Sequence, residues 1–173
     1  MPWILILLVI LMAGACSVII VLSLRASYRT LLSDIDSTVT KIHEITSLRL
    51  DIYDRMHGLL FFFAGDSLPP KKEFSIPQDA AAQELYDLNV LIDTELSLLI
   101  DTASQNEELR KQRGVTIRNT EAELEKLESE LTTSILFFND RIRTSKRYKH
   151  FILSGYFLSG IEQLEYREII FHE

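Results

Sequence analysis

Charged residues are absent from the first part of the sequence, between Pro2 and Leu24. Most positions there are Ile, Leu, Val, Met or Ala, and a helix needs about 20 such residues to cross the hydrocarbon core of a membrane. Trp3 at one end and Arg25 and Arg29 beyond the other suit the two membrane interfaces. A cleaved signal peptide would instead place basic residues before a shorter apolar run. The sequence therefore predicts an uncleaved N-terminal transmembrane anchor over residues 1–24.

Cysteine is almost absent too, because Cys16 is the only one in the chain, and an intramolecular disulfide is excluded. The residues Ala-Gly-Ala-Cys at 13–16 resemble a degenerate bacterial lipobox, which makes Cys16 a candidate lipidation site. However, the apolar run continues from Ser17 to Leu22, whereas mature lipoproteins usually become polar at once. We therefore interpret Cys16 as a small apolar residue of the membrane helix, with lipidation as the alternative.

Motifs for catalysis and for metal or cofactor binding are also missing. The four His residues lack the spacing of a zincin-type site, in which two His stand four residues apart with Glu between them. Asp34 and Asp36 are two residues apart, so on a helix they point to different faces and cannot share a proton. There is no glycine-rich phosphate loop and no nucleophile elbow. We predict no enzyme activity, no catalytic, metal or cofactor-binding residue and no cofactor, and these absences argue against a small-molecule ligand.

Charge appears only beyond the anchor, where 18 basic and 25 acidic residues give the chain a net charge of −7. Such a balance argues against nucleic-acid binding, which requires a basic face.

The same region has a strong helical period. From residue 28 to residue 63, apolar positions recur at steps of three and four, and Arg49 occupies one position of this seam. The positions are Tyr28, Leu32, Ile35, Val39, Ile42, Thr46, Tyr53, Met56, Leu60 and Phe63. We expect a helix about 55 Å long, covered along its seam by partner helices.

Two further helices are expected after a break at residues 65–77, which contain Pro69, Pro70 and Pro77. Ser75 followed by Gln78 predicts a capping box at the start of the second helix, and a bend is expected near 103–106. Its apolar face is Leu85, Leu88, Ile92, Leu96, Leu99 and Ala103, and that of the third helix is Ile117, Leu124, Leu127, Leu131, Ile135, Phe138 and Ile142. We predict an all-α fold in which residues 25–150 form an elongated antiparallel bundle of three to four long helices.

The C-terminal part, residues 151–173, differs in character. A run rich in basic residues at 141–149 precedes an uncharged run, Phe151–Ile161, that is too short to span a membrane. One interpretation places this run in the membrane interface with the basic residues near anionic head groups; the other folds it back to cap the bundle. For Phe61, Phe62 and Phe63, one interpretation has one or two of them capping the end of the bundle, and the other makes the three an exposed partner-binding patch. The candidate partner or membrane contacts are Phe61, Phe62, Phe63, Arg141, Arg143, Arg147, Phe151, Tyr156 and Phe157.

Three short segments follow the anchor in order: Ser-Asp-Ile-Asp at 33–36, Phe-Asn-Asp-Arg-Ile-Arg-Thr at 138–144 and Gly-Tyr-Phe at 155–157. Together with the anchor and the long helices, they resemble the LemA family of bacterial membrane-anchored helical-bundle proteins. The chain departs from the family pattern where Leu32 replaces a Trp, Phe138 replaces a Tyr, and no Pro follows Arg143. The resemblance implies a diverged member with an extended antiparallel bundle and no established catalytic residues.

These observations favour a membrane-tethered scaffold or adaptor that binds protein partners or self-assembles. The alternative is a ligand-sensing accessory protein of the cell envelope. Basic residues follow the anchor and none precedes it, which predicts a single-pass protein with its bundle in the cytoplasm rather than the periplasm. The resemblance to the LemA family implies that the membrane is the bacterial inner membrane. The expected partners are membrane lipid and protein, including a second copy of the chain.

Overall fold

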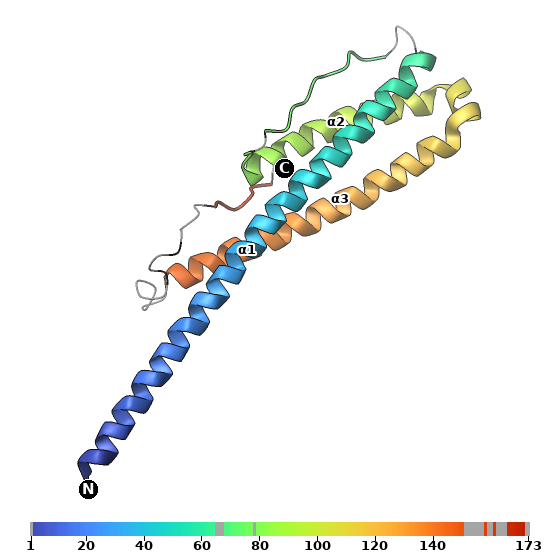
Figure 1. Cartoon of the computed structure of the whole chain (residues 1–173). Coiled ribbons are helices and arrows are strands. Elements are labelled where there is room, and N and C mark those ends of the chain that lie inside the picture. Colours follow the sequence, from blue (N-terminus) through green and yellow to red (C-terminus); the bar gives the residue numbers. More distant parts are fainter. Residues whose placement is uncertain are drawn as a thin grey trace. The chain divides into compact units, whose positions relative to one another are not determined.

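The structure is a computed structural model that describes residues 2–64, 68–77, 79–150, 158, 161 and 166–171. Its helices are α1 (Pro2–Ala64), α2 (Ala82–Gln105) and α3 (Glu107–Lys149), and the residues so described contain no strand (Figure 1). The all-α class is confirmed. The chain divides into two compact units, unit 1 with Met1–Ser37 and Asn139–Arg167, and unit 2 with Thr38–Phe138 and Glu168–Glu173. Helices α1 and α3 contribute to both units.

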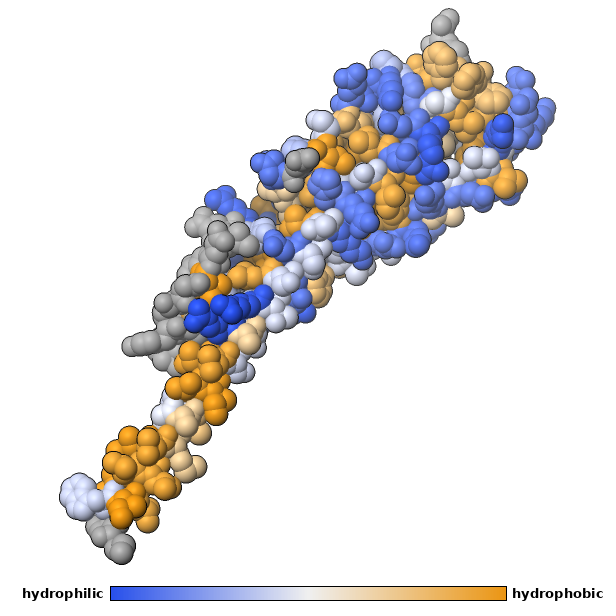
Figure 2. All heavy atoms as spheres, in the orientation of Figure 1, coloured by the Kyte–Doolittle hydropathy of each residue, from blue (hydrophilic) through white to orange (hydrophobic). Residues whose placement is uncertain are grey.

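Helix α1 joins the apolar stretch to the first bundle helix without a break, because neither Pro nor Gly interrupts it between Gly14 and Gly58. Within the described residues it is the one helix long and apolar enough to cross a membrane. Large hydrophobic side chains from Trp3 to Leu22 are exposed, and Figure 2 shows hydrophilic side chains gathering only beyond them. This exposure is unfavourable in water, so the stretch requires an apolar environment.

In unit 2 most of the predicted seam of α1 is buried, namely Ile42, Thr46, Arg49, Tyr53, Met56 and Leu60, while Val39 and Phe63 are half-buried. Ile45 and Ile52 are buried as well, so the buried face of α1 is wider than the predicted seam. On α2, Leu85, Ile92, Leu96, Leu99 and Ala103 are buried as predicted, while Leu88 is half-buried and Asn89 takes its place in the core. The helical period therefore located most of the core.

The relative direction of α1 and α2 differs from the antiparallel expectation. Near the start of α2, Asn89 Nδ2 donates to Thr46 Oγ1 at 2.6 Å. Just beyond its end, Asn106 Nδ2 donates to Phe63 O at 3.1 Å. Both contacts join residues 43 positions apart, so the two helices run parallel in unit 2 (Figure 1). Helix α3 runs in the opposite direction to α1 in unit 2, because Asn106, directly before α3, contacts Phe63, while Glu123, farther along α3, lies 3.3 Å from the earlier residue Arg55 (Figure 1).

The physical reason for the parallel pair is a non-helical return segment, Leu68–Ala81, of which Gln78 lies outside the described residues. His57 Nε2 lies 3.1 Å from Pro69 O, Lys72 N donates to Tyr53 Oη at 2.9 Å, and Tyr53 packs edge-on against Phe74. Successive residues of the segment thus contact earlier turns of α1. Fourteen extended residues reach about 45 Å, enough to return along the roughly 36 Å of α2 before that helix begins.

The predicted start of the second helix, at Ser75, is wrong. Helix α2 begins at Ala82, where the Glu84 side chain accepts from the Ala81 N–H at 3.0 Å. Pro77 disfavours helical backbone in the residue before it, whereas Glu84 satisfies an N–H that the first turn leaves unpaired. The expected bend is confirmed, since Asn106 separates α2 from α3 and Arg113 carries non-helical dihedral angles within α3.

Candidate membrane-proximal site and buried polar layer

In unit 1 the last turns of α3 pack against α1 immediately beyond the apolar stretch. The rings of Tyr28 and Tyr148 are 5.9 Å apart, and Arg141 Nε lies 3.4 Å from Asp34 Oδ2. The two helices are therefore antiparallel here, and the C-terminal end of α3 lies level with Tyr28. That level is about 6 Å beyond Leu24. A bilayer whose hydrocarbon core ended at Leu24 would have its head-group layer, about 5–8 Å thick, at this level.

This end of unit 1 gathers positive charge. We define the basic cluster as Arg25, Arg29, Arg143, Lys146, Arg147 and Lys149. All six residues are exposed or half-buried, and the last turns of α3, from Arg141 to Lys149, contain no carboxylate. Cations at a helix C-terminus also interact favourably with the helix dipole. The arrangement can attract anionic groups at the level where the apolar stretch ends.

The carboxylates of α1 in unit 1 have separate partners. Asp34 pairs with Arg141, and Asp36 accepts a hydrogen bond from Tyr166 Oη. Partial burial, followed by the hydrogen bond to Asp36 and the negative charge of that carboxylate, raises the pKa of Tyr166 to about 12. Tyr166 therefore remains a neutral donor at physiological pH. The prediction that Asp34 and Asp36 lie on different faces agrees with these contacts.

Unit 2 contains a buried polar layer, which we define as Thr46, Arg49, Asn89 and Asp93. Arg49 is 3% exposed, its Nη1 donates to Asn89 Oδ1 at 3.3 Å, and its Nη2 pairs with Asp93. Asn89 also donates to Leu85 O at 2.8 Å. A cavity of about 200 Å³ adjoins the layer and is lined by Tyr86, Leu131 and Phe171 among others. The layer links α1 to α2 by directional bonds that fix their register.

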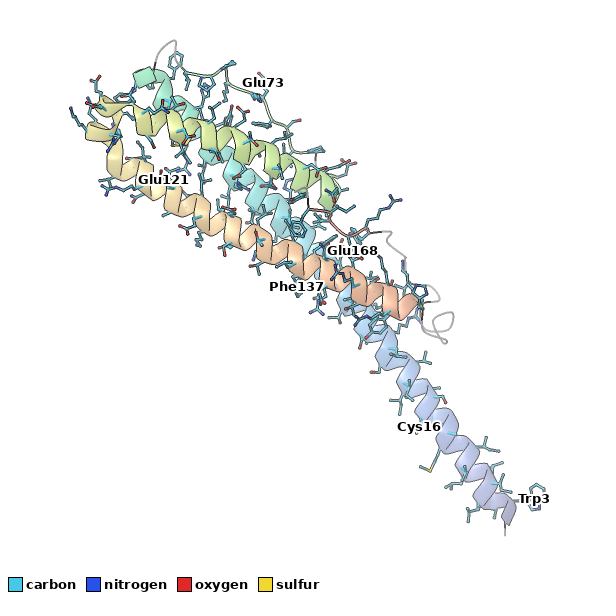
Figure 3. All side chains as sticks on the ribbon, turned by 180° about the vertical axis from the view of Figure 1, so that it is seen from behind. Trp3, Cys16, Glu73, Glu121, Phe137 and Glu168 are labelled. Atoms are coloured by element: carbon cyan, nitrogen blue, oxygen red, sulfur yellow. The ribbon has the colours of Figure 1, made fainter. Side chains whose placement is uncertain are left out.

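The predicted contact residues fall in both units. Arg141, Arg143 and Arg147 lie together in unit 1, and Cys16 is exposed on the apolar stretch, where its side chain points away from α1 (Figure 3). Phe61 and Phe62 are 66% and 83% exposed at the end of α1, and Leu60 is buried there. Phe63 is half-buried. Phe151, Tyr156 and Phe157 lie outside the described residues.

Sequence reasoning missed the partners of Arg49 and the tyrosine of unit 1. Asn89 interrupts the apolar face of α2 four residues after Leu85, and such a polar residue in a core position was the available signal. Nothing local to Tyr166 indicated its contact with Asp36, which is 130 residues away. Within the described residues, no group of three or more His, Cys, Asp or Glu side chains is placed to hold a metal ion.

Comparison with protein-family models, curated proteins and solved structures found no match to this chain. The resemblance to the LemA family therefore stays a prediction. What can be said of function comes from the chain's own residues.

Proposed function

We propose that this chain is a non-catalytic, membrane-tethered scaffold whose helical bundle binds a partner protein or a second copy of itself. The continuity of α1 carries the proposal. Its exposed apolar stretch passes into the buried seam with no linker, so insertion of the stretch in a membrane would hold the bundle at the bilayer surface. A role as a diverged relative of the LemA family is consistent with this architecture.

We place the bundle on the cytoplasmic side of a bacterial inner membrane. The basic cluster supports this orientation, because Arg and Lys close to a membrane span are retained preferentially on the cytoplasmic side. The sequence alone supplied Arg25 and Arg29 for this argument. Because Tyr148 packs on Tyr28, the basic residues at the end of α3 lie near Arg25 and Arg29 and add to their positive charge.

Protease accessibility in intact spheroplasts, read with an antibody to the C-terminus, tests the orientation. We expect the C-terminal epitope to survive external protease and to be lost after the membrane is permeabilised. Loss of the epitope in intact spheroplasts would place the bundle in the periplasm and contradict the proposal.

A ligand-sensing accessory protein is the alternative, and the cavity beside Arg49 is the observation that bears on it. Its volume of about 200 Å³ lies below the about 300–1,000 Å³ of typical small-molecule sites, and the Arg49 charge is already paired with Asp93. These properties favour a structural role for Arg49. A ligand library that leaves the melting temperature unchanged would agree with that role, whereas a reproducible rise would revive the sensor.

Site-specific photo-crosslinking in cells tests the scaffold directly. A crosslinking residue at Phe62, which is 83% exposed, probes the far end of α1, and one at Leu91, 57% exposed, probes the outer face of α2. The buried position Leu96 serves as a matched control on the same helix. We expect a discrete higher-mass product from at least one exposed position and none from Leu96. Monomer alone at every exposed position would contradict the proposal.

A further inference from the structure

Unit 1 is basic in a chain that is acidic as a whole. The net charge of the protein is −7, yet the described part of unit 1 carries Arg25, Arg29, Arg141, Arg143, Lys146, Arg147, Lys149 and Arg167 against Asp34, Asp36 and Asp140. Glu162 and Glu165, which lie outside the described residues, leave basic residues in excess. Positive charge is thus concentrated in the unit that contains the apolar stretch of α1.

A cavity of about 230 Å³ opens within this unit, between α1 and the end of α3. Three cations line it, Lys146 and Lys149 from α3 and Arg167 from the C-terminal segment. The Ser145 hydroxyl lies beside them, and Leu32 and Ile142 supply apolar lining. The volume is below that of typical small-molecule sites but ample for one phosphate group.

The chemistry of the lining selects an anion with several acceptor oxygens. Lysine ammonium groups act as point charges toward phosphate, and arginine can donate two parallel hydrogen bonds to it. Leu32, Ile35 and Ile142 make part of the lining apolar, which suits a phosphate carried on a molecule with hydrocarbon rather than a fully hydrated ion. Lys149 follows Tyr148, which packs on Tyr28 at the level estimated for the head groups.

We propose that this cavity binds the phosphate group of an anionic lipid. The lipid belongs to the leaflet on the side of the membrane where α1 continues beyond Leu24. The inference rests on the membrane tether of the proposed function and is independent of any protein partner. Bound lipid would join the end of α3 to the bilayer surface, so that the bundle is attached both through α1 and through lipid held at the end of α3. Each basic residue near an anionic membrane adds about fivefold to such an affinity.

Native mass spectrometry of the full chain in uncharged detergent tests the proposal, with phosphatidylglycerol and phosphatidylcholine supplied in equal amounts. We expect the wild type to retain phosphatidylglycerol at least tenfold in preference to phosphatidylcholine. The triple variant Lys146→Gln/Lys149→Gln/Arg167→Gln should lose that preference. The charge-conserving variant Lys146→Arg/Lys149→Arg should keep it, which separates loss of charge from a failure to fold.

A matched control removes equal charge from unit 2, through Lys111→Gln/Arg118→Gln/Lys126→Gln, all at exposed positions of α3. This variant should keep the preference. Equal retention of both lipids by the wild type, or an equal loss in the control, would overturn the proposal. Displacement of phosphatidylglycerol by an equal concentration of inorganic phosphate would assign the cavity to a free ion and overturn the lipid assignment. Membrane fractionation of the same variants reports separately on the tether, which the triple variant should leave intact.

Discussion

Arg49 illustrates how one buried charge organises this chain. It occupies a position that the helical period assigns to an apolar residue, and its bonds to Asn89 and Asp93 compensate for its removal from water. Breaking such a pair leaves a charge without its partner. Asp93 is 55% exposed at its side chain, so the cost is moderated by solvent.

The Arg49–Asp93 pair yields a prediction for stability. Asp93→Asn should lower the free energy of unfolding by about 1–2 kcal/mol, because the Arg49 charge stays buried with a weaker acceptor. In a double-mutant cycle with Arg49→Met, the coupling should be about 1 kcal/mol or more. Denaturant unfolding of the full chain in detergent measures both quantities. Asp101→Asn, at an exposed position of the same helix, is the control, and a coupling near zero would contradict the importance of the pair.

Tyr166 yields a prediction for pH. Its pKa in the folded protein, about 12, is raised above the ordinary value of 10.0, so its contribution to stability is complete below pH 10 and is lost as the pH rises through 12. Between these pH values, the wild type should lose about 1 kcal/mol more unfolding free energy than Tyr166→Phe. The difference between the two proteins cancels the contribution of every other ionisable group. Parallel pH profiles would show that the Asp36 contact contributes nothing.

At the scale of elements, the junction between α2 and α3 depends on Asn106. Its Oδ1 accepts from the Leu109 N–H at 2.9 Å, which caps α3, and its Nδ2 donates to Phe63 O at the end of α1. One side chain therefore satisfies two helix ends.

We expect Asn106→Ala to lower the free energy of unfolding by about 1–2 kcal/mol, because the first turn of α3 and the last turn of α1 each lose a partner. Thermal or denaturant unfolding followed by circular dichroism measures the change. Asn119→Ala, at an exposed position within α3, should change stability by less than about 0.5 kcal/mol. Equal effects of the two substitutions would mean that Asn106 does not act as a cap.

The elements also show what a sequence reveals and what it does not. The buried face of α1 was predictable because residues such as Ile35, Ile42 and Met56 repeat with the helical period. The direction of α2 was not, because it depends on a contact between Thr46 and Asn89 and on the return path of residues 68–81. These are long-range properties to which local periodicity is blind.

The candidate site was likewise predictable from the sequence only in part. The basic residues at the end of α3 were visible as a run in the sequence, and so was the apolar stretch that they accompany. Their shared level follows only from the antiparallel packing of Tyr148 on Tyr28. Arg167 joins Lys146 and Lys149 at one cavity through a C-terminal segment that no local signal placed there.

At the scale of the whole molecule, we propose that the apolar stretch of α1 stays attached to the bundle and anchors it in a membrane. Cleavage as a signal peptide, processing at Cys16 and retention of the whole stretch would each leave a different mature chain. A cleaved signal peptide would leave a soluble bundle, and processing at Cys16 would leave a lipidated chain without residues 1–15. An uncleaved stretch would leave the full-length chain anchored in the membrane. Cys16→Ala would then change neither the length of the chain nor its attachment to the membrane.

The intact mass of the chain recovered from carbonate-washed membranes distinguishes these possibilities most directly. Carbonate removes peripheral proteins and leaves those held by a transmembrane helix or a stable lipid anchor. An uncleaved α1 anchor predicts a membrane-bound species with the mass of the full unmodified chain, 19.9 kDa. Recovery of the chain in the carbonate supernatant, or of a membrane-bound species that begins at a lipidated Cys16, would contradict it.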